Sequence, residues 1–264
     1  MISTPDGPPN EAPHTWSRFV AVGDSFTEGL EDPGTDGRHR GWADRLAEQL
    51  GAINPDFHYA NLAIRGRRVP AIVSEQVPAA IALEPDLLSI AAGVNDAMRT
   101  SWDLPATAEL MEDAVRDAKA HGTDVLLVSF GNPSRRSASL RTITRRLAEY
   151  REILLAIAHD QQCYMLDFWP ETAFDDPRFW AEDRLHLNAS GHERAAAAAL
   201  EVLGLGDGSW RAPLEPTDPL SRAQALRGHA RWTGKHLAPW IGRRVTGRSS
   251  GDDVDPKRPT FEPM

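Results

Sequence analysis

Five short apolar runs, separated by longer amphipathic stretches, constrain the fold of this chain of 264 residues more than any other feature. Each run is continuous rather than alternating, which is typical of parallel strands that are buried on both faces. The sequence predicts strands at 18–23, 57–63, 86–93, 124–131 and 163–169, and helices at 41–51, 69–83, 105–122, 139–162 and 189–206. Because strands alternate with helices, we expect a parallel sheet with helices on both faces.

Composition divides the chain into five segments. Residues 1–16 contain four prolines and are expected to be a disordered lead, whereas 17–206 carry the strand and helix pattern. Residues 207–218, rich in Pro, Gly and Asp, are interpreted as a linker. Residues 219–251 form a basic extension with tryptophans, seven Arg or Lys and no Asp or Glu, and 252–264 are expected to be a disordered tail.

The basic extension has three possible roles. We expect it to pack on the acidic body, because exposed tryptophan side chains are costly. It could instead bind a partner or another copy of the chain, or lie on an anionic membrane surface, where basic residues and tryptophan are typical. The oligomeric state stays open.

Overall charge and cysteine content exclude several classes of function. The formal net charge is −9, which argues against nucleic-acid binding by the chain as a whole. A single cysteine, Cys163, excludes an intrachain disulfide and a cysteine-rich metal site. No secretory signal peptide and no apolar run of about 18 residues is present, so we expect a soluble cytoplasmic protein.

A serine follows the first predicted strand. Ser25 lies in the stretch Gly23-Asp24-Ser25, directly beyond that strand. In a parallel sheet the ligand site lies beyond the carboxyl ends of the strands, so the hydroxyl could be a nucleophile in that crevice. Ser25 could equally be an ordinary turn residue, and the G-x-S-x-G elbow of α/β-hydrolases is absent.

A base for such a serine is found before the last predicted helix. Asp183 and His186 are three residues apart, so one loop could supply a general base and the carboxylate that orients it. His192 is the nearest alternative base, but no acid precedes it by three residues and it is expected within the helix. The alternative interpretation of Asp183 and His186 is a local turn with a polar loop histidine.

Two further residues could stabilise an oxyanion, the negative oxygen that forms during acyl transfer. Gly66 follows the second predicted strand, and a glycine lets the main chain approach a ligand closely. Asn95 follows the third strand and carries a side-chain amide. Gly66 as a turn residue and Asn95 with Asp96 as a helix cap are the alternatives.

These four blocks resemble those of the SGNH hydrolases of the GDSL esterase/lipase group. The matching residues occur in the family's order: Gly23-Asp24-Ser25, Gly66, Gly93-Val94-Asn95-Asp96 and Asp183-Arg184-Leu185-His186. The resemblance spans residues 17–205, with GDSF in place of GDSL. It implies a three-layer α/β/α fold, flavodoxin-like, with a five-stranded parallel sheet.

The resemblance also implies roles for the site residues. Ser25 would be the nucleophile, His186 the base and Asp183 its orienting acid. The main-chain N–H groups of Ser25 and Gly66 and the amide of Asn95 would form the oxyanion hole. The family implies a serine esterase acting on a small-molecule ester, with no metal and no cofactor.

The substrate is less constrained. A carbohydrate O-deacetylase is the alternative within this family, and a non-hydrolytic binding module on the same fold is the alternative outside enzymes. Five arginines near the four blocks could bind an anionic substrate or could simply be solvated: Arg65, Arg67, Arg68, Arg99 and Arg184.

Overall fold

A central six-stranded sheet organises the computed structural model, which describes residues 15–136, 140–215 and 250–264. The strand order is β5-β4-β3-β1-β2-β6. The first five strands are parallel and β6 is antiparallel to β2. Their bounds are β1 (Arg18–Gly23), β2 (His58–Asn61), β3 (Leu87–Ala91), β4 (Asp124–Ser129), β5 (Tyr164–Asp167) and β6 (Arg258–Pro263). The predicted parallel sheet is confirmed, with one strand more than the five expected.

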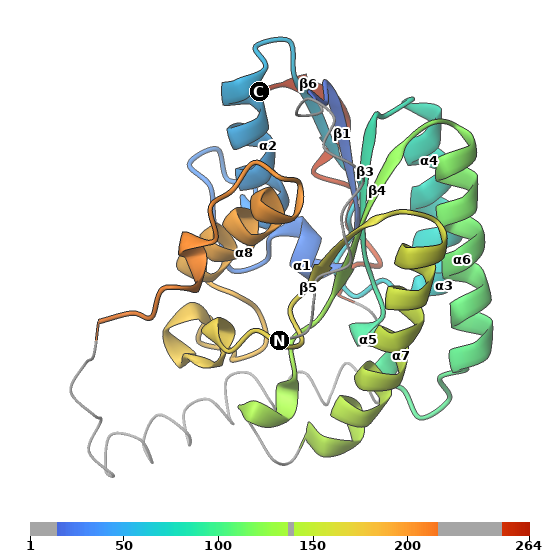
Figure 1. The fold of residues 1–264 in the computed structure, drawn as a ribbon, viewed down its shortest axis with the longest axis vertical. Helices are drawn as coiled ribbons and strands as arrows, with labels where there is room; N and C mark the ends of the chain where they lie inside the picture. The colour runs from blue at the N-terminus through green and yellow to red at the C-terminus, as the bar shows by residue number, and fades with distance from the viewer. Residues whose placement is uncertain (1–14, 137–139, 216–249) are drawn as a thin grey trace.

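Helices cover both faces of this sheet, as Figure 1 shows. On one face lie α2 (Gly41–Ile53) and α8 (Ala189–Val202). On the other lie α3 (Val69–Ala71), α4 (Val77–Ala82), α6 (Leu104–Ala120) and α7 (Arg141–Asp160). Two one-turn helices, α1 (Ser25–Glu28) and α5 (Val94–Ala97), follow β1 and β3. The predicted three-layer α/β/α arrangement is therefore confirmed. None of the helices in the described ranges is long and apolar enough to cross a lipid bilayer.

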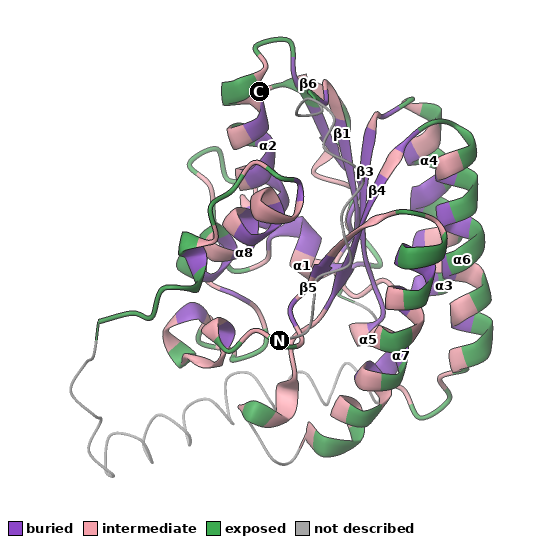
Figure 2. Cartoon of the chain, in the orientation of Figure 1, coloured by how far each residue is buried: buried purple, intermediate pink, exposed green. Residues whose placement is uncertain are grey.

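The central strands β1, β3 and β4 are buried on both faces, which explains their continuous apolar sequences (Figure 2). In β1, Phe19 and Ala21 join the core beneath α2 and α8. Val20 and Val22, on the opposite face, join the core beneath α3, α4, α6 and α7. Successive strand residues point to opposite faces, so both positions of the alternation must be apolar.

The predicted helix at 69–83 is interrupted in its middle. A π-helical turn, Ile72–Gln76, separates α3 from α4 where Pro78 lacks the N–H that an α-helix would use. The side chain of Gln76 is buried and bonds both main-chain groups of Gly23, accepting at 2.8 Å and donating at 3.0 Å. The interrupted helix thus holds the end of β1, directly before Ser25.

Three boundaries differ from those predicted. Residues 258–263 form β6, so the expectation of a disordered tail over 252–264 is wrong there. The sequence Arg-Pro-Thr-Phe-Glu-Pro lacks an apolar run, but an edge strand tolerates proline and charge. Trp16 is buried and bonds Asp124, so the expected lead ends before it. The expected linker contains a 3₁₀ turn, Ser209–Arg211, with Trp210 buried. Residues 1–14 and 216–249, hence most of the basic extension, lie outside the described residues.

Candidate active site

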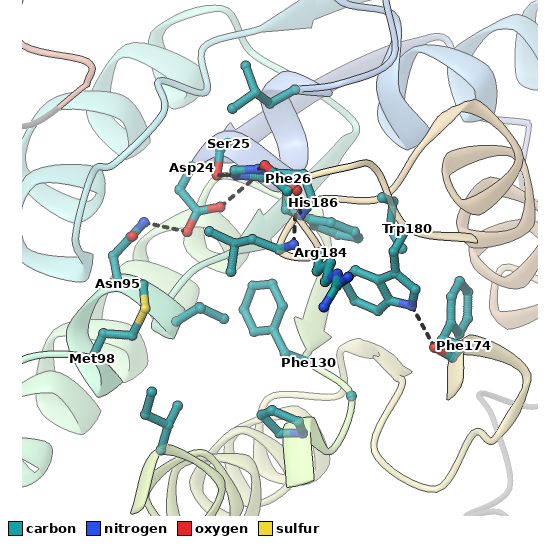
Figure 3. A pocket seen from close by; sticks show the side chains of 18 of the residues that line it. Asp24, Ser25, Phe26, Asn95, Met98, Phe130, Phe174, Trp180, Arg184 and His186 are labelled. Carbon is teal, nitrogen blue, oxygen red and sulfur yellow. Dashed lines mark hydrogen bonds and ion pairs between the residues drawn. The ribbon is translucent and has the colours of Figure 1, made fainter. Parts of the chain in front are cut away.

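The loops after β1, β2 and β3 and the loop before α8 meet at the carboxyl ends of the parallel strands. They line a cavity of about 550 Å³. Ser25, Gly66, Asn95, Asp183 and His186 all line it, so the sequence-predicted site residues lie around one space. Figure 3 shows His186 turned toward Ser25, and Asn95 turned toward Asp24.

Ser25 is the first residue of α1, directly beyond the end of β1. Asp24 caps this helix by accepting a hydrogen bond from the Phe26 N–H at 3.1 Å. Gly23 allows the tight turn, since a Cβ on this residue would lie 2.5 Å from the carbonyl oxygen of Ala91. At the first position of a helix the N–H of Ser25 has no intrahelical acceptor. The turn therefore presents both the hydroxyl and this N–H for use by a ligand.

Ser25, His186 and Asp183 form one hydrogen-bonded chain across loops that are far apart in sequence. The Nε2 of His186 lies 2.9 Å from the Ser25 Oγ, and its Nδ1 lies 2.6 Å from the Asp183 Oδ2. Asp183 is ionised and can only accept, so Nδ1–H donates to it and Nε2 is left to accept from the serine hydroxyl. This is the arrangement in which an imidazole can remove a proton from serine.

Local hydrogen bonds hold Asp183 in place. Its Oδ1 accepts from the N–H groups of Leu185 at 2.9 Å and of His186 at 3.0 Å. Burial opposes ionisation, but the hydrogen bond and charge of His186 outweigh it and, with these N–H groups, keep the pKa of Asp183 below its usual value. The carboxylate is therefore charged at neutral pH and fixes the orientation of the imidazole.

His192, the alternative base, occupies a different environment. It lies within α8 and is almost fully buried. Its Nδ1 accepts from the main-chain N–H of Trp42 at 3.2 Å, and its Nε2 lies 3.3 Å from the carbonyl oxygen of Leu30. Burial lowers the pKa of His192 to about 4. Both ring nitrogens are occupied by main-chain groups, so this histidine holds the core together.

Gly66 lies in the loop after β2 with a φ of 75°, a left-handed conformation that favours glycine. Within the part of the chain that the structure describes, the main-chain N–H groups of Ser25 and Gly66 donate to no protein acceptor. The preceding residue, Arg65, is held by a partly buried ion pair with Glu28 at the end of α1. The geometry leaves two N–H groups able to donate to a ligand atom in the cavity.

The Asn95 amide, expected from sequence as an oxyanion donor, already donates to protein groups in the structure. Its side-chain Nδ2 donates to the Asp24 Oδ2 at 2.8 Å and to the carbonyl oxygen of Arg67 at 3.0 Å. An amide nitrogen carries two hydrogens, so both have a protein acceptor. Burial raises the pKa of Asp24 to about 6. Sequence reasoning did not foresee this contact, because nothing in the motif shows which way the Asn95 amide points.

A tyrosine fixes the start of the Asn95 turn. Gly93 has a φ of 115°, and a Cβ there would lie 2.4 Å from the ring of Tyr150 on α7. Any other residue at position 93 would be strained and would also clash with this ring. Gly93 therefore lets α7 pack closely against the turn that carries Asn95.

Most of the cavity wall is apolar. Phe26 lies beside Ser25 and packs against Trp42, Phe130 and Phe168, with ring centroids 5.6, 5.7 and 6.2 Å away. Much of the remaining apolar lining comes from the β3–α5 region, the start of α7 and the segment before α8: Val94, Met98, Leu140, Ile143, Leu147, Phe174, Trp180, Leu185 and Leu187. These side chains are suited to an apolar group larger than a methyl.

The five arginines predicted near the site differ in their partners and in whether they line the cavity. Arg65 pairs with Glu28, and Arg67 lies 3.4 Å from Glu75, so both have carboxylate partners. Arg99 and Arg184 line the cavity together with Arg65. Arg68 does not line this cavity but a smaller one beside α6.

Arg136 is a cavity residue that sequence reasoning missed. Its guanidinium lies over the ring of Trp180, 3.3 Å from the centroid, and donates to the carbonyl oxygen of Arg184 at 3.0 Å. Burial lowers its pKa to about 10, so it is charged at neutral pH. Two adjacent arginines in a polar loop gave no signal of this stacking.

Within the described residues, no group of three or more His, Cys, Asp or Glu side chains converges to hold a metal ion. The arrangement that does converge, a serine, an imidazole, a carboxylate and two main-chain N–H groups beside an apolar cavity, provides the chemical groups for acyl transfer.

The chain is similar to several known proteins. Residues 21–194 match the sequence profile of the GDSL-like lipase/acylhydrolase family. Among solved structures, a catalytic mutant of the acetylxylan esterase Axe2 from Geobacillus stearothermophilus has 20% identity and a TM-score of 0.62, covering 73% of this chain and 97% of that one. LAE5, an α/β hydrolase enzyme from the metagenome of Lake Arreo, Spain, has 22% identity and a TM-score of 0.61, with the same coverage.

TesA has 21% identity and a TM-score of 0.60, covering 71% of this chain and 98% of that one. At identities of 20 to 22%, these three structures show that the chain shares their fold. No curated protein sequence matches the chain significantly.

Proposed function

Because this chain belongs to the GDSL-like lipase/acylhydrolase family, whose members hydrolyse ester bonds, we propose that it cleaves a carboxylic ester through an acyl-enzyme on Ser25. The observation that carries the proposal is the hydrogen-bonded chain from Ser25 through His186 to Asp183. It begins at a hydroxyl that lines the cavity and ends at an ionised carboxylate.

In the first half of the reaction, the Ser25 Oγ attacks the ester carbonyl carbon while the Nε2 of His186 takes its proton. The C=O π electrons move to the oxygen, which becomes an oxyanion. Asp183 stabilises the imidazolium that forms. As the tetrahedral intermediate collapses, the imidazolium gives its proton to the leaving alkoxide, and the acyl group stays on Ser25 as an ester.

In the second half, a water molecule attacks the acyl-enzyme. His186 takes a proton from this water and later returns one to the Ser25 Oγ as the acid leaves. The atoms balance as one ester and one water giving one acid and one alcohol. Both halves of this proposed reaction use the hydrogen-bonded chain, the oxyanion donors and one water molecule, and neither calls for a cofactor.

The oxyanion donors we propose are the N–H groups of Ser25 and Gly66 and the amide of Asn95. The two main-chain groups have no protein acceptor in the described chain, which supports their role. The Asn95 amide already donates to Asp24 and to the Arg67 carbonyl. One of these bonds must be shared or exchanged when the oxyanion forms, and the weaker acceptor is Asp24 once it is protonated. Its raised pKa of about 6 makes that state accessible near neutral pH.

For the substrate, we propose an ester whose acyl group is longer than acetyl. The support is the wall of Phe26, Phe130 and Ile143 and the volume of about 550 Å³, which an acetyl group would leave largely unfilled. An O-deacetylase remains the alternative, since one similar structure is an acetylxylan esterase. A binding module without hydrolytic activity is the alternative outside enzymes.

The test is hydrolysis of p-nitrophenyl esters from acetate to palmitate by the full chain, with Ser25→Ala as the matched control. We expect turnover that rises from acetate to medium-length acyl chains and that Ser25→Ala abolishes. A preference for acetate would instead support the O-deacetylase. No turnover at any length, together with no labelling of Ser25 by a fluorophosphonate, would support the binding module and overturn the proposal.

A further inference from the structure

The segment 250–264 lies against the same loops that form the candidate site. Ser250 lines the cavity, and Gly251 packs so closely on the carbonyl oxygen of Arg65 that a Cβ would lie 2.1 Å from it. From there the chain runs to β6, which pairs with β2 at the edge of the sheet. The segment therefore connects the cavity rim to the sheet edge.

Lys257 is the buried charge of this segment. Its side chain is 8% exposed, and its Nζ has three acceptors: the carbonyl oxygens of Glu28 at 2.6 Å and His39 at 2.8 Å, and the Asp44 Oδ2 at 2.5 Å. An ammonium group has three hydrogens, so every one is used. Burying a charge so completely is costly unless each donor is satisfied, which ties these three sites together.

Glu28 links this lysine to the site. It is the last residue of α1, the helix that begins at Ser25. Its buried carboxylate accepts from the Arg65 main-chain N–H at 2.7 Å and from the Arg65 Nε at 3.0 Å. Arg65 directly precedes Gly66. One residue thus joins the turn of the proposed nucleophile to the loop of a proposed oxyanion donor. We call Lys257, Asp44, Glu28 and Arg65 the C-terminal cluster.

We propose that Lys257 is a positioning residue for ester hydrolysis: by holding the carbonyl of Glu28, it fixes the α1 turn relative to the Gly66 loop. The inference rests on the function proposed above and deepens it. Lys257 touches neither Ser25 nor the cavity, so it acts through Glu28 and Arg65. Oxyanion stabilisation depends on donors placed within a few tenths of an ångström, and misplacement by about 1 Å can cost on the order of 100-fold in rate.

The experiment compares Lys257→Met with the wild-type full chain on its best p-nitrophenyl ester. We expect kcat to fall by about 10- to 100-fold while KM changes by less than about threefold, because the donors are displaced but the cavity is kept. Phe261→Ala is the matched control. Phe261 packs its ring on His58 of β2, so its removal should loosen β6 without altering a contact of the C-terminal cluster. Its kcat should stay within about twofold of wild type.

A second readout separates positioning from general loss of stability. Lys257 holds the Glu28 main chain, and the Glu28 carboxylate links that turn to Arg65. Glu28→Gln weakens the second link, so Lys257→Met should lower kcat much less in a Glu28→Gln background than in wild type. Independent, multiplying effects on kcat would overturn the inference, as would a Lys257→Met kcat equal to that of wild type.

Lys257→Met alone leaves the Asp44 carboxylate buried without its lysine and could fail to fold. The double variant Asp44→Leu/Lys257→Met removes both charges, which proteins tolerate better, yet still leaves the Glu28 carbonyl without its donor. Its kcat should fall as for the single variant, and wild-type kcat would overturn the inference. If the wild-type chain neither turns over any ester nor labels with a fluorophosphonate, the proposed function fails, and this inference with it. Wild-type turnover with an unaffected variant refutes the inference alone.

Discussion

Two groups of polar side chains meet at the one-turn helix α1, one at its first residue and one at its last. The cavity-facing chain, Ser25, His186 and Asp183, begins at the first. The C-terminal cluster includes the last, Glu28, whose carbonyl oxygen accepts from Lys257. Both contain a basic group paired with a carboxylate at a distance of 2.6 Å or less. The two groups differ in whether the basic side chain has a position left to contact a ligand.

His186 uses one nitrogen on Asp183 and presents the other to a hydroxyl at the cavity. Lys257 uses all three hydrogens on protein acceptors. A basic group paired with a carboxylate is therefore suited to proton transfer where one of its positions faces a ligand, and to holding main chain where none does. The comparison predicts that substitutions in the cavity-facing chain change chemistry, whereas those in sealed groups change position or stability.

The largest effect is expected at His186. His186→Gln removes the only base in contact with Ser25 among the described residues and should lower kcat by at least about 10⁴-fold with little change in unfolding. His192→Gln is the control, because His192 also lines the cavity but its ring nitrogens lie against main-chain groups rather than Ser25. It should lower the melting temperature yet keep kcat within about tenfold of wild type. A reversal of these two outcomes would show that His192, and not His186, is the base.

Asn95 should give the next largest effect. Asn95→Ala removes one proposed oxyanion donor and should cost about 2.7–4 kcal/mol in the transition state, or roughly 10²- to 10³-fold in kcat. Asn54→Ala is a matched control, since that amide also donates to a main-chain carbonyl, of Trp16, but outside the cavity. Steady-state kinetics of both variants provide the measurement. An unchanged kcat in Asn95→Ala would mean that the Asn95 amide serves only to bind Asp24 and does not stabilise the oxyanion.

The two kinds of carboxylate should respond to pH with opposite signs. Asp183 has a lowered pKa, so it contributes stability at pH values above about 3.8 that is lost as pH falls further. Burial raises the pKa of Asp96 to about 6, so its contribution is fully present below about 3.8 and is lost as pH rises through 6. Asp44 of the C-terminal cluster is raised to about 6 for the same reason.

Asp96→Asn tests this sign, because its carboxylate accepts from the Val69 N–H rather than from a buried lysine. An amide oxygen can still accept there. Relative to wild type, the variant should gain about 2 kcal/mol in free energy of unfolding between pH 4 and pH 7.5. Urea unfolding at both pH values measures this. If the free energies of unfolding of the two proteins changed with pH in parallel, burial would not raise the pKa of Asp96.

The smallest effect is expected at the surface of β6. Glu262 pairs with Arg38, and both side chains are more than a third exposed; its other partner, Arg258, lies on the same strand. Glu262→Gln should change the free energy of unfolding by less than about 0.5 kcal/mol and leave kcat unchanged. A loss above about 1 kcal/mol by urea unfolding would mean that this exposed pair, rather than sealed Lys257, docks the segment.

The sequence was most informative where structure is local or buried on both sides. The central strands were predictable because Phe19 and Val20 face different cores and must both be apolar. Asp183 and His186 share one short loop, so their spacing alone suggested that they interact. The family blocks then suggested which serine the imidazole would face.

Long-range polar contacts left no such trace. Lys257 and Glu28 are separated by 229 positions, and neither residue stands out from its neighbours in sequence. β6 contains two prolines and charged residues, and it is a strand only because β2 offers an unpaired edge. The Asp24 contact of Asn95 depends on a side-chain rotation that no spacing encodes.

The position of β6 bears on when the protein becomes active during its synthesis. Residues 17–206 contain all five parallel strands and every residue proposed to react or to stabilise the oxyanion. A nascent chain of that length can begin to collapse, since domains fold as they emerge from the ribosome. If Lys257 positions the α1 turn as proposed, such a chain has its full set of reactive groups but not their final geometry. Hydrolytic competence would then appear only after residue 257 has emerged, long after the serine itself was made.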